Sequence, residues 1–323
     1  MINFDTEFKG KLLNFPTCKE PVWCRGGHAQ TLFGHFFKKE SKLSSFRRIR
    51  ISTYDDNSLF CYLHEGTNEK VIVLFHGLTG SSYSGYMTRL GNRFAKQGNT
   101  VLLVNHRGAH PFLKESESLY HSGRSEDASA VFEWLRESFP KKLIVAIGFS
   151  MSANILLLNA AGIRSKEKPD FLIAVNGPID LLKTVRNIDN GINRFYGHSF
   201  LREMMKMHLT DNIPHTIFEY DQRYTAPRGG FASAHDYYRQ CSALNYVKEI
   251  SIPTLILAAK NDPIISSEMY FVTKWPESVC IRMEESGGHL GYIQKLSQSS
   301  FFWMDEYFDY AIQLLPSKKV VTD

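Results

Sequence analysis

The stretch that decides the fold is Ile147-Gly148-Phe149-Ser150-Met151-Ser152-Ala153-Asn154. The apolar run before it, residues 143–147, predicts a buried strand, and the run after it, residues 154–158, predicts a helix. A Gly-x-Ser-x-small sequence between a strand and a helix is typical of a nucleophile elbow, because small residues on both sides let strand and helix pack closely. We therefore expect the Ser150 hydroxyl to be exposed at the strand tip. Ser152 replaces the usual last glycine, and we expect serine to be small enough for the turn.

Outward from this turn, short apolar runs alternate with helical patterns. Strands are predicted at 47–53, 59–64, 71–75, 100–105, 143–147, 171–176, 254–259 and 279–283, and helices at 83–97, 127–138, 151–161 and 302–315. From residue 71 onward the strand runs are apolar throughout, as expected for parallel strands that are covered on both faces. The pattern predicts a doubly wound α/β sheet with helices on both faces.

Two segments depart from this alternation. Residues 1–45 are predicted to form an irregular N-terminal arm. Residues 178–250 are rich in aromatic, methionine and basic residues, and we interpret them as an inserted helical cap over the site. Ordinary helical packing without ligand contact is the alternative. The predicted organisation is a core of residues 1–177 and 251–323, with the cap at 178–250.

A glycine-containing loop follows the strand at 71–75. Its sequence is His76-Gly77-Leu78-Thr79-Gly80. Acyl transfer places negative charge on the carbonyl oxygen, and two preorganised N–H donors stabilise that charge. We predict that these donors are the backbone N–H groups of Leu78 and of Met151, the residue after the serine. A plain glycine-rich turn is the alternative.

An acid and a histidine follow in the order Ser…Asp…His. Asp262 lies directly after the strand at 254–259, and His289 lies between glycines after the strand at 279–283. The carboxylate of Asp262 would accept a hydrogen bond from His289 and fix its tautomer, and His289 would act as general base toward Ser150. This chain order is the one that α/β-hydrolases have. Asp262 could also form a simple Asp-Pro turn.

The composition restricts the remaining classes of function. The 323 residues are 43% hydrophobic and carry a net charge of +5 with dispersed basic residues, so we expect one globular protein without a nucleic-acid partner. The five cysteines form no C-x-x-C pair, and we expect neither disulfides nor a metal site. No dinucleotide or phosphate-binding motif is present, so no cofactor is expected. We see neither a signal peptide nor an apolar run that could span a membrane, and the expected location is the cytoplasm. His106 and His110 could line the pocket.

With these residues in hand, the chain resembles the YheT-like branch of the α/β-hydrolases. The motifs that carry the resemblance are Gly27-His28-x-Gln30-Thr31, His106-Arg107-Gly108, Tyr120-His121-Ser122-Gly123 with Glu126-Asp127-Ala128, and Asp236-Tyr237-Tyr238-Arg239 with Ser242-Ala243. The chain departs from the family at Ser152-Ala153, where two glycines are usual, and at Ala109-His110-Pro111. The resemblance implies an esterase that acts on a small or lipid-like ester, with Ser150, Asp262 and His289 as catalytic triad. An acyltransferase that uses an alcohol, or a catalytically silent binding protein, are the alternatives.

Overall fold

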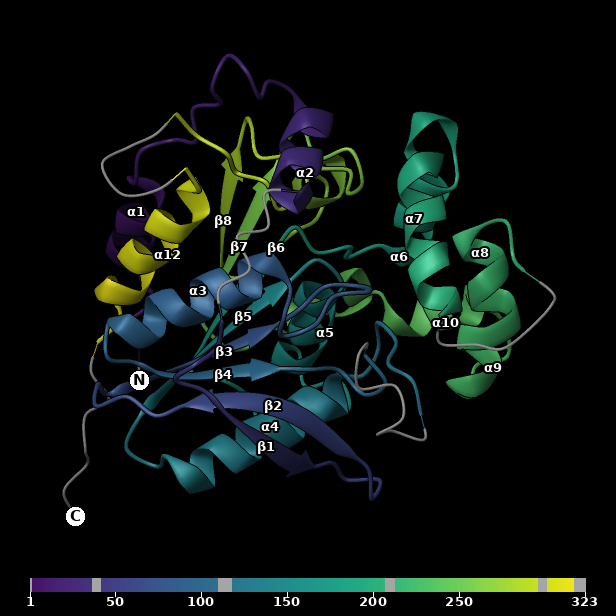
Figure 1. Ribbon diagram of the computed structural model, residues 1–323. Helices are drawn as coiled ribbons and strands as arrows, with labels where there is room; N and C mark the ends of the chain where they lie inside the picture. Colours follow the sequence, from purple (N-terminus) through teal and green to yellow (C-terminus); the bar gives the residue numbers. More distant parts are fainter. Residues whose placement is uncertain (1, 37–41, 110–117, 207–212, 296–300, 317–323) are drawn as a thin grey trace.

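The structure, a computed structural model, describes residues 2–36, 42–109, 118–206, 213–295 and 301–316. Its centre is an eight-stranded sheet in the order β1-β2-β4-β3-β5-β6-β7-β8 (Figure 1). The strands are β1 Arg47–Ser52, β2 Ser58–His64, β3 Lys70–Phe75, β4 Thr100–Val104, β5 Leu143–Phe149, β6 Phe171–Val175, β7 Thr254–Ala259 and β8 Val279–Glu284. β1, β2 and β4 pair antiparallel, and the other neighbours pair parallel.

All the predicted strands are present. The largest difference is at β5, which continues to Phe149 instead of ending at Ile147. Every residue of β5 is buried, as are all residues of β4, β6 and β7. The uninterrupted apolar runs therefore belong to strands that are covered on both faces, as the sequence pattern predicts.

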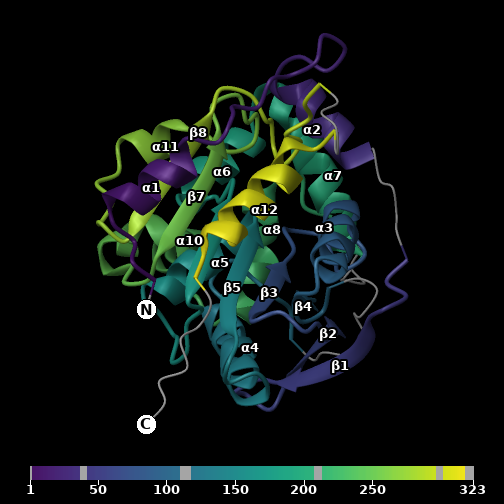
Figure 2. The ribbon, with the colours of Figure 1, turned by 90° about the vertical axis from the view of Figure 1, so that its left-hand side faces the viewer.

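Helices cover both faces of the sheet. One face packs against α1 Thr6–Leu13, α3 Gly85–Lys96 and α12 Trp303–Leu314. Figure 2 shows α12 crossing the strands on this face, with α1 and α3 on either side. The other face packs against α4 Ser125–Ser138 and α5 Met151–Ala160. Both layers bury apolar side chains against the strands, which fixes the positions of the loops at the strand ends.

The prediction that residues 1–45 are irregular is wrong. They contain α1 and a second helix, α2 Gly27–Phe36. The Asp5 side chain caps α1 by accepting a hydrogen bond from the N–H of Phe8 at 2.9 Å. Leu12 is fully buried, and its carbonyl accepts a hydrogen bond from the Tyr307 hydroxyl. Helices this short depend on tertiary packing for their stability, so the local sequence pattern gives little sign of them.

The chain between β6 and β7, which we call the β6–β7 segment (residues 178–250), is helical where it is described. Its elements are α6 Leu181–Ile188, η2 Gly191–Asn193, α7 Arg194–Met205, α8 Ile217–Tyr220, the π-helical turn η3 Asp221–Thr225, α9 Ala226–Arg228, α10 Ala234–Cys241 and η4 Ala243–Glu249. Helices α6 to α10 lie together to one side of the sheet (Figure 1). A short helix α11, Glu268–Phe271, follows β7.

Across the described ranges, no helix is long and apolar enough to cross a lipid bilayer.

Candidate active site

Ser150 occupies the sharp turn between β5 and α5. Its backbone has φ 53° and ψ −119°, a conformation with positive φ that non-glycine residues adopt rarely, and its N–H donates to the Val175 carbonyl at 2.8 Å. A Cβ atom on Gly148 would come within 2.7 Å of the Ser152 carbonyl oxygen. The strand and the helix therefore approach each other as closely as the Gly-x-Ser pattern predicts.

The structure brings together the three residues that the sequence predicts as nucleophile, base and acid. His289 Nε2 lies 2.9 Å from Ser150 Oγ, and His289 Nδ1 lies 2.8 Å from Asp262 Oδ2. The other Asp262 oxygen accepts the N–H groups of Ile264 and Ile265 at 2.8 and 3.0 Å. With its Nδ1–H donated to the carboxylate, the imidazole presents Nε2 as acceptor toward the serine hydroxyl.

Asn176 supports this arrangement and was missed in the sequence. Its Nδ2 donates to Asp262 Oδ2 at 2.6 Å and to the Gly288 carbonyl at 3.2 Å, and its Oδ1 accepts from the Tyr292 hydroxyl at 2.6 Å. The one signal that could have found Asn176 is its place directly after β6, because functional side chains of parallel sheets gather at the carboxyl ends of strands.

The N-terminal G-H-x-Q-T motif also reaches the site. Thr31 Oγ1 accepts the N–H of His289 at 2.8 Å, and Gln30 Oε1 accepts the N–H of Ile293 at 2.7 Å. A Cβ atom on Gly288 would lie 2.6 Å from the Gly27 carbonyl oxygen, so α2 packs directly on the loop that carries the histidine. The His28 ring stacks on Tyr196 of α7, with Nδ1 2.9 Å from the tyrosine hydroxyl.

The loop 76–80 lies beside the serine, since a Cβ atom on Gly77 would come within 3.1 Å of Ser150 Cβ. The flanking N–H groups of Gly77 and Thr79 donate to the hydroxyls of Tyr86 and Tyr120, each at 2.9 Å. Among the described residues, no acceptor takes the N–H of Leu78 or that of Met151. Both predicted donors are therefore available to a ligand oxygen, as an oxyanion site requires.

Ser152 belongs to a buried network behind this loop. Its hydroxyl donates to the His76 carbonyl and lies 2.6 Å from His106 Nε2. The backbone N–H of His106 donates to His76 Nε2 at 3.2 Å, and the ring Nδ1–H of His76 donates to the Gly77 carbonyl at 2.8 Å. Burial lowers the pKa of His76 to about 4 and that of His106 well below its usual value, so both imidazoles are neutral near pH 7.

Other motifs that were singled out in the sequence make structural contacts. Arg107 is fully buried and pairs with Asp127 of α4 and with Asp55 in the β1–β2 turn. Asn154 Oδ1 accepts the N–H of Ala243, and its Nδ2 donates to the Cys241 carbonyl, which ties the β6–β7 segment to α5. These contacts hold the elements together and do not involve the serine.

A pocket opens between Ser150 and the β6–β7 segment, with about 1010 Å³ of free space including its mouth. Most of its wall is apolar: Leu78, Leu119, Met151, Pro178, Leu181, Val185, Ile188, Phe200, Met204, Ile217, Ile264 and Ile265. His106 is buried and does not line it, contrary to expectation. His110 lies outside the described residues.

The comparisons with known proteins agree with this geometry. A family model described as the α/β-hydrolase fold matches residues 70–197. The chain has the α/β-hydrolase fold. This confirms the predicted fold class, an α/β-hydrolase fold with a mostly parallel sheet.

Individual relatives match this chain over most of its length. YheT of Escherichia coli, which carries the provisional name of an esterase, is 29% identical over 86% of this chain and 87% of its own. Phospholipase ABHD3 of Homo sapiens is 23% identical over 91% of this chain and 78% of its own. The solved structure of the Pyrococcus furiosus esterase Pf2001 superimposes with a TM-score of 0.57 at 19% identity, covering 82% and 92% of the two chains. The predicted resemblance to YheT is confirmed.

Proposed function

We propose that this α/β-hydrolase is a serine hydrolase that cleaves carboxylic esters through an acyl-enzyme on Ser150. The observation that carries the proposal is the hydrogen-bonded chain from Asp262 through His289 to Ser150, together with the apolar pocket that Ser150 lines. Relatives that are named as an esterase and a phospholipase support a carboxylic ester hydrolase.

The proposed reaction follows from the positions of these groups. His289 Nε2 takes the proton of Ser150 as Oγ attacks the ester carbonyl, while Asp262 holds the ring and stabilises the imidazolium. The N–H groups of Leu78 and Met151 donate to the oxygen that becomes negative. His289 then returns the proton to the leaving alcohol, and a water molecule, deprotonated in the same way, releases the acid from Ser150.

We further propose that the β6–β7 segment is the cap of this site, with residues 1–177 and 251–323 as the core. Its side chains line the pocket together with Ser150, and their apolar character suits an acyl chain. The five cysteines are all free thiols, which supports a reducing compartment and therefore the cytoplasm as the proposed location.

The decisive experiment measures hydrolysis of p-nitrophenyl esters from acetate to palmitate by wild type, Ser150→Ala and Asp262→Asn. We expect no turnover with Ser150→Ala, and a loss on the order of 10⁴ in kcat with Asp262→Asn, because the imidazole would then take the wrong tautomer. Equal turnover by wild type and Ser150→Ala would refute the assignment of the nucleophile.

Added alcohol separates hydrolysis from acyl transfer. With a short alcohol present, the proposed hydrolase releases mainly acid, whereas an acyltransferase forms mainly the new ester. Folded wild-type protein that binds esters and turns over none of them would instead identify a silent binding protein.

A further inference from the structure

The π-helical turn η3 places a carboxylate in the wall of the pocket. Asp221 is 6% exposed and lines the same pocket as Ser150. Its Oδ1 accepts from the Thr225 hydroxyl at 2.6 Å, and its Oδ2 accepts from the Tyr238 hydroxyl at 2.7 Å. π-Helical turns inside helices often occur at functional sites. Nothing in the proposed ester cleavage uses this carboxylate.

Asp221 has no cationic partner in the part of the chain that the structure describes. Arg228, which also lines the pocket, is exposed, and its guanidinium lies over the Tyr224 ring, 5.9 Å from the ring centroid. The charged group that acts on the Asp221 carboxylate is a second carboxylate, Asp189. Burial raises the pKa of Asp221 to about 6, because two hydroxyl donors compensate only part of the desolvation.

Four tyrosine side chains line the pocket together with this carboxylate. Tyr220, Tyr224, Tyr237 and Tyr238 all line the pocket beside Asp221, and the ring centroids of the pairs 220–224 and 237–238 are 5.3 and 5.2 Å apart. Aromatic faces attract cations, most strongly where water is excluded. A buried carboxylate among tyrosine rings therefore offers both attractions that an organic cation needs.

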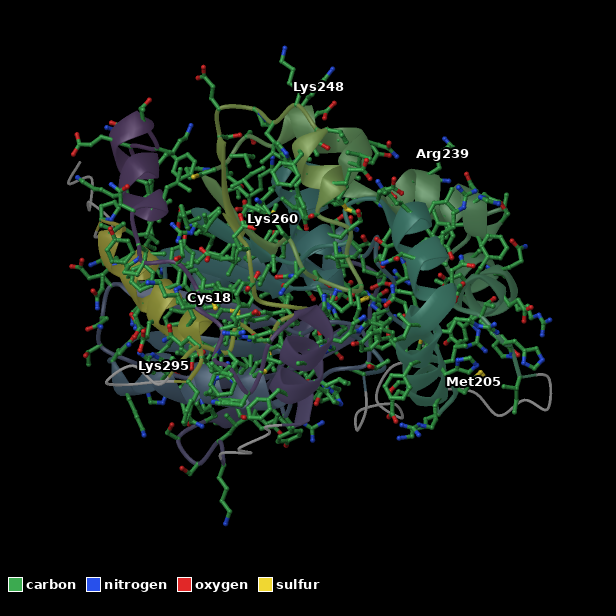
Figure 3. All side chains as sticks on the ribbon, turned by 90° about the horizontal axis from the view of Figure 1, so that it is seen from above. Cys18, Met205, Arg239, Lys248, Lys260 and Lys295 are labelled. Atoms are coloured by element: carbon green, nitrogen blue, oxygen red, sulfur yellow. The ribbon has the colours of Figure 1, made fainter. Side chains whose placement is uncertain are left out.

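We propose that Asp221 and the surrounding tyrosines form a binding site for an alkylammonium group. The inference rests on the proposed function and adds a substrate class to it: esters that carry an alkylammonium group at the end remote from the ester bond. The apolar wall formed by residues such as Leu181, Val185 and Phe200 would hold the hydrocarbon chain between the two ends. Among the described residues no cation pairs with the Asp221 carboxylate, and exposed basic side chains such as Arg239 in Figure 3 project from the surface of the segment.

The test uses pairs of p-nitrophenyl alkanoates that differ only at the far end of the acyl chain. One member ends in a trimethylammonium group and the other in the neutral tert-butyl group of the same shape, with spacers of two to ten methylenes. At the best spacer length and pH 8, we expect kcat/KM to be about tenfold or more higher for the cationic member. Asp221→Asn should reduce this ratio to about one while the neutral ester is still hydrolysed. Glu203→Gln, which removes a partly exposed carboxylate from α7, should leave the ratio unchanged.

A ratio of about one at every spacer length, with the neutral esters hydrolysed, overturns the ammonium site and leaves the proposed function intact. If Asp221→Asn does not fold, the wild-type ratio should still fall as the pH drops through about 6, because the carboxyl group becomes neutral. Effects of pH on the catalytic steps that the two esters share cancel from the ratio. The polar and charged groups that interact with Asp221 include Asp189, Thr225, Tyr220, Tyr237 and Tyr238, and Arg228 lies in the wall of the same pocket. A ratio that does not change with pH in this range contradicts the proposal.

Binding tests the site without catalysis. Ser150→Ala is titrated calorimetrically with octyltrimethylammonium, and we expect heat of binding. The double variant Ser150→Ala with Asp221→Asn should give none, and octanesulfonate should bind to neither variant. Equal binding of octyltrimethylammonium by both variants overturns the site even if no ester is hydrolysed. A lipid ester with an ammonium head group in mixed micelles forms a further arm. A preference for the ammonium member in both arms shows that the site also accepts a lipid head group, and a preference confined to the soluble esters shows that it accepts free ammonium esters but not the lipid.

Discussion

Ser152 occupies a position that is usually glycine, and its hydroxyl forms buried hydrogen bonds. It donates to the His76 carbonyl and meets His106 Nε2, immediately behind the loop that presents Leu78. Ser152, His76 and His106 are all buried, so water cannot replace these hydrogen bonds. The departure from the family motif therefore adds a connection between the β5–α5 turn and the loop 76–80.

Removing the Ser152 hydroxyl should destabilise the protein, although the substitution deletes a single oxygen atom. Ser152→Ala leaves the buried His106 Nε2 and the His76 carbonyl with fewer partners, and we expect the free energy of unfolding to fall by about 1–3 kcal/mol. Ester turnover should also fall, because the loop carrying Leu78 loses support. Ser82→Ala is the matched control, since the Ser82 hydroxyl is equally buried and has no hydrogen-bond partner among the described residues. Urea unfolding that shows equal losses for both variants would contradict this role of Ser152.

Among the elements, the close contact between β5 and α5 sets the position of Ser150. A Cβ atom at Gly148 would meet the Ser152 carbonyl oxygen and Leu156 Cδ1, both at 2.7 Å. Because the first of these is backbone, the helix itself would have to move. We expect Gly148→Ala to lower the free energy of unfolding by about 1–3 kcal/mol, as overpacking does, and to reduce ester turnover by displacing the serine.

Gly10 provides the control for this substitution. It lies inside α1, and a Cβ atom there would have nothing within 4 Å, so Gly10→Ala should instead stabilise the protein by about 0.5–1 kcal/mol through helix propensity. Thermal and urea unfolding of both variants measure the difference. A neutral effect of Gly148→Ala on both stability and turnover would mean that the serine does not depend on this contact.

The same elements show what the sequence predicts and what it does not. The strand β7 was predicted with its observed bounds, because six consecutive buried residues leave an unbroken apolar run. The helices α1 and α2 were missed, because contacts with β8, α12 and the loop at Gly288 stabilise them more than their own pattern does.

At the scale of the whole molecule, the sequence predicts some residues of the candidate site and not others. Ser150, Asp262 and His289 could be predicted, since each directly follows a recognisable strand or turn and their order is characteristic. Asn176 and the tyrosine hydroxyls at positions 86 and 120 could not, because each contacts residues that are not its neighbours along the chain. The position of the Asp221 carboxylate in the pocket could not be predicted either, because it depends on how the whole β6–β7 segment folds.

Three neutral, buried histidines make the stability of the whole protein sensitive to acid. Burial lowers the pKa of His76 to about 4 and the pKa values of His106 and His121 well below the usual 6.5. Between about pH 6.5 and pH 4 the unfolded chain therefore binds more protons than the folded protein, and stability falls as the pH falls. His76 alone accounts for about 3 kcal/mol over this range. Asp221 acts in the opposite direction, because its raised pKa makes the folded state bind up to one proton more than the unfolded chain between about pH 6 and the usual aspartate value of 3.8.

We therefore expect the free energy of unfolding to decrease from pH 7 to pH 4.5, with a net slope that the histidines dominate over Asp221. Urea unfolding at half-unit pH intervals measures this slope directly. His121→Gln removes one of the three titrating groups, and the slope of its pH dependence should be smaller by up to one proton, whatever its stability at pH 7. His198→Gln is the control variant at an exposed histidine, whose Nδ1 lies 2.7 Å from the Arg194 carbonyl oxygen of the same helix, and it should change the slope less than His121→Gln does. Stability that is constant or rises toward pH 4.5 in the wild type would show that these histidines take up protons in the folded state, and the neutral histidine network behind the loop 76–80 would then be wrong.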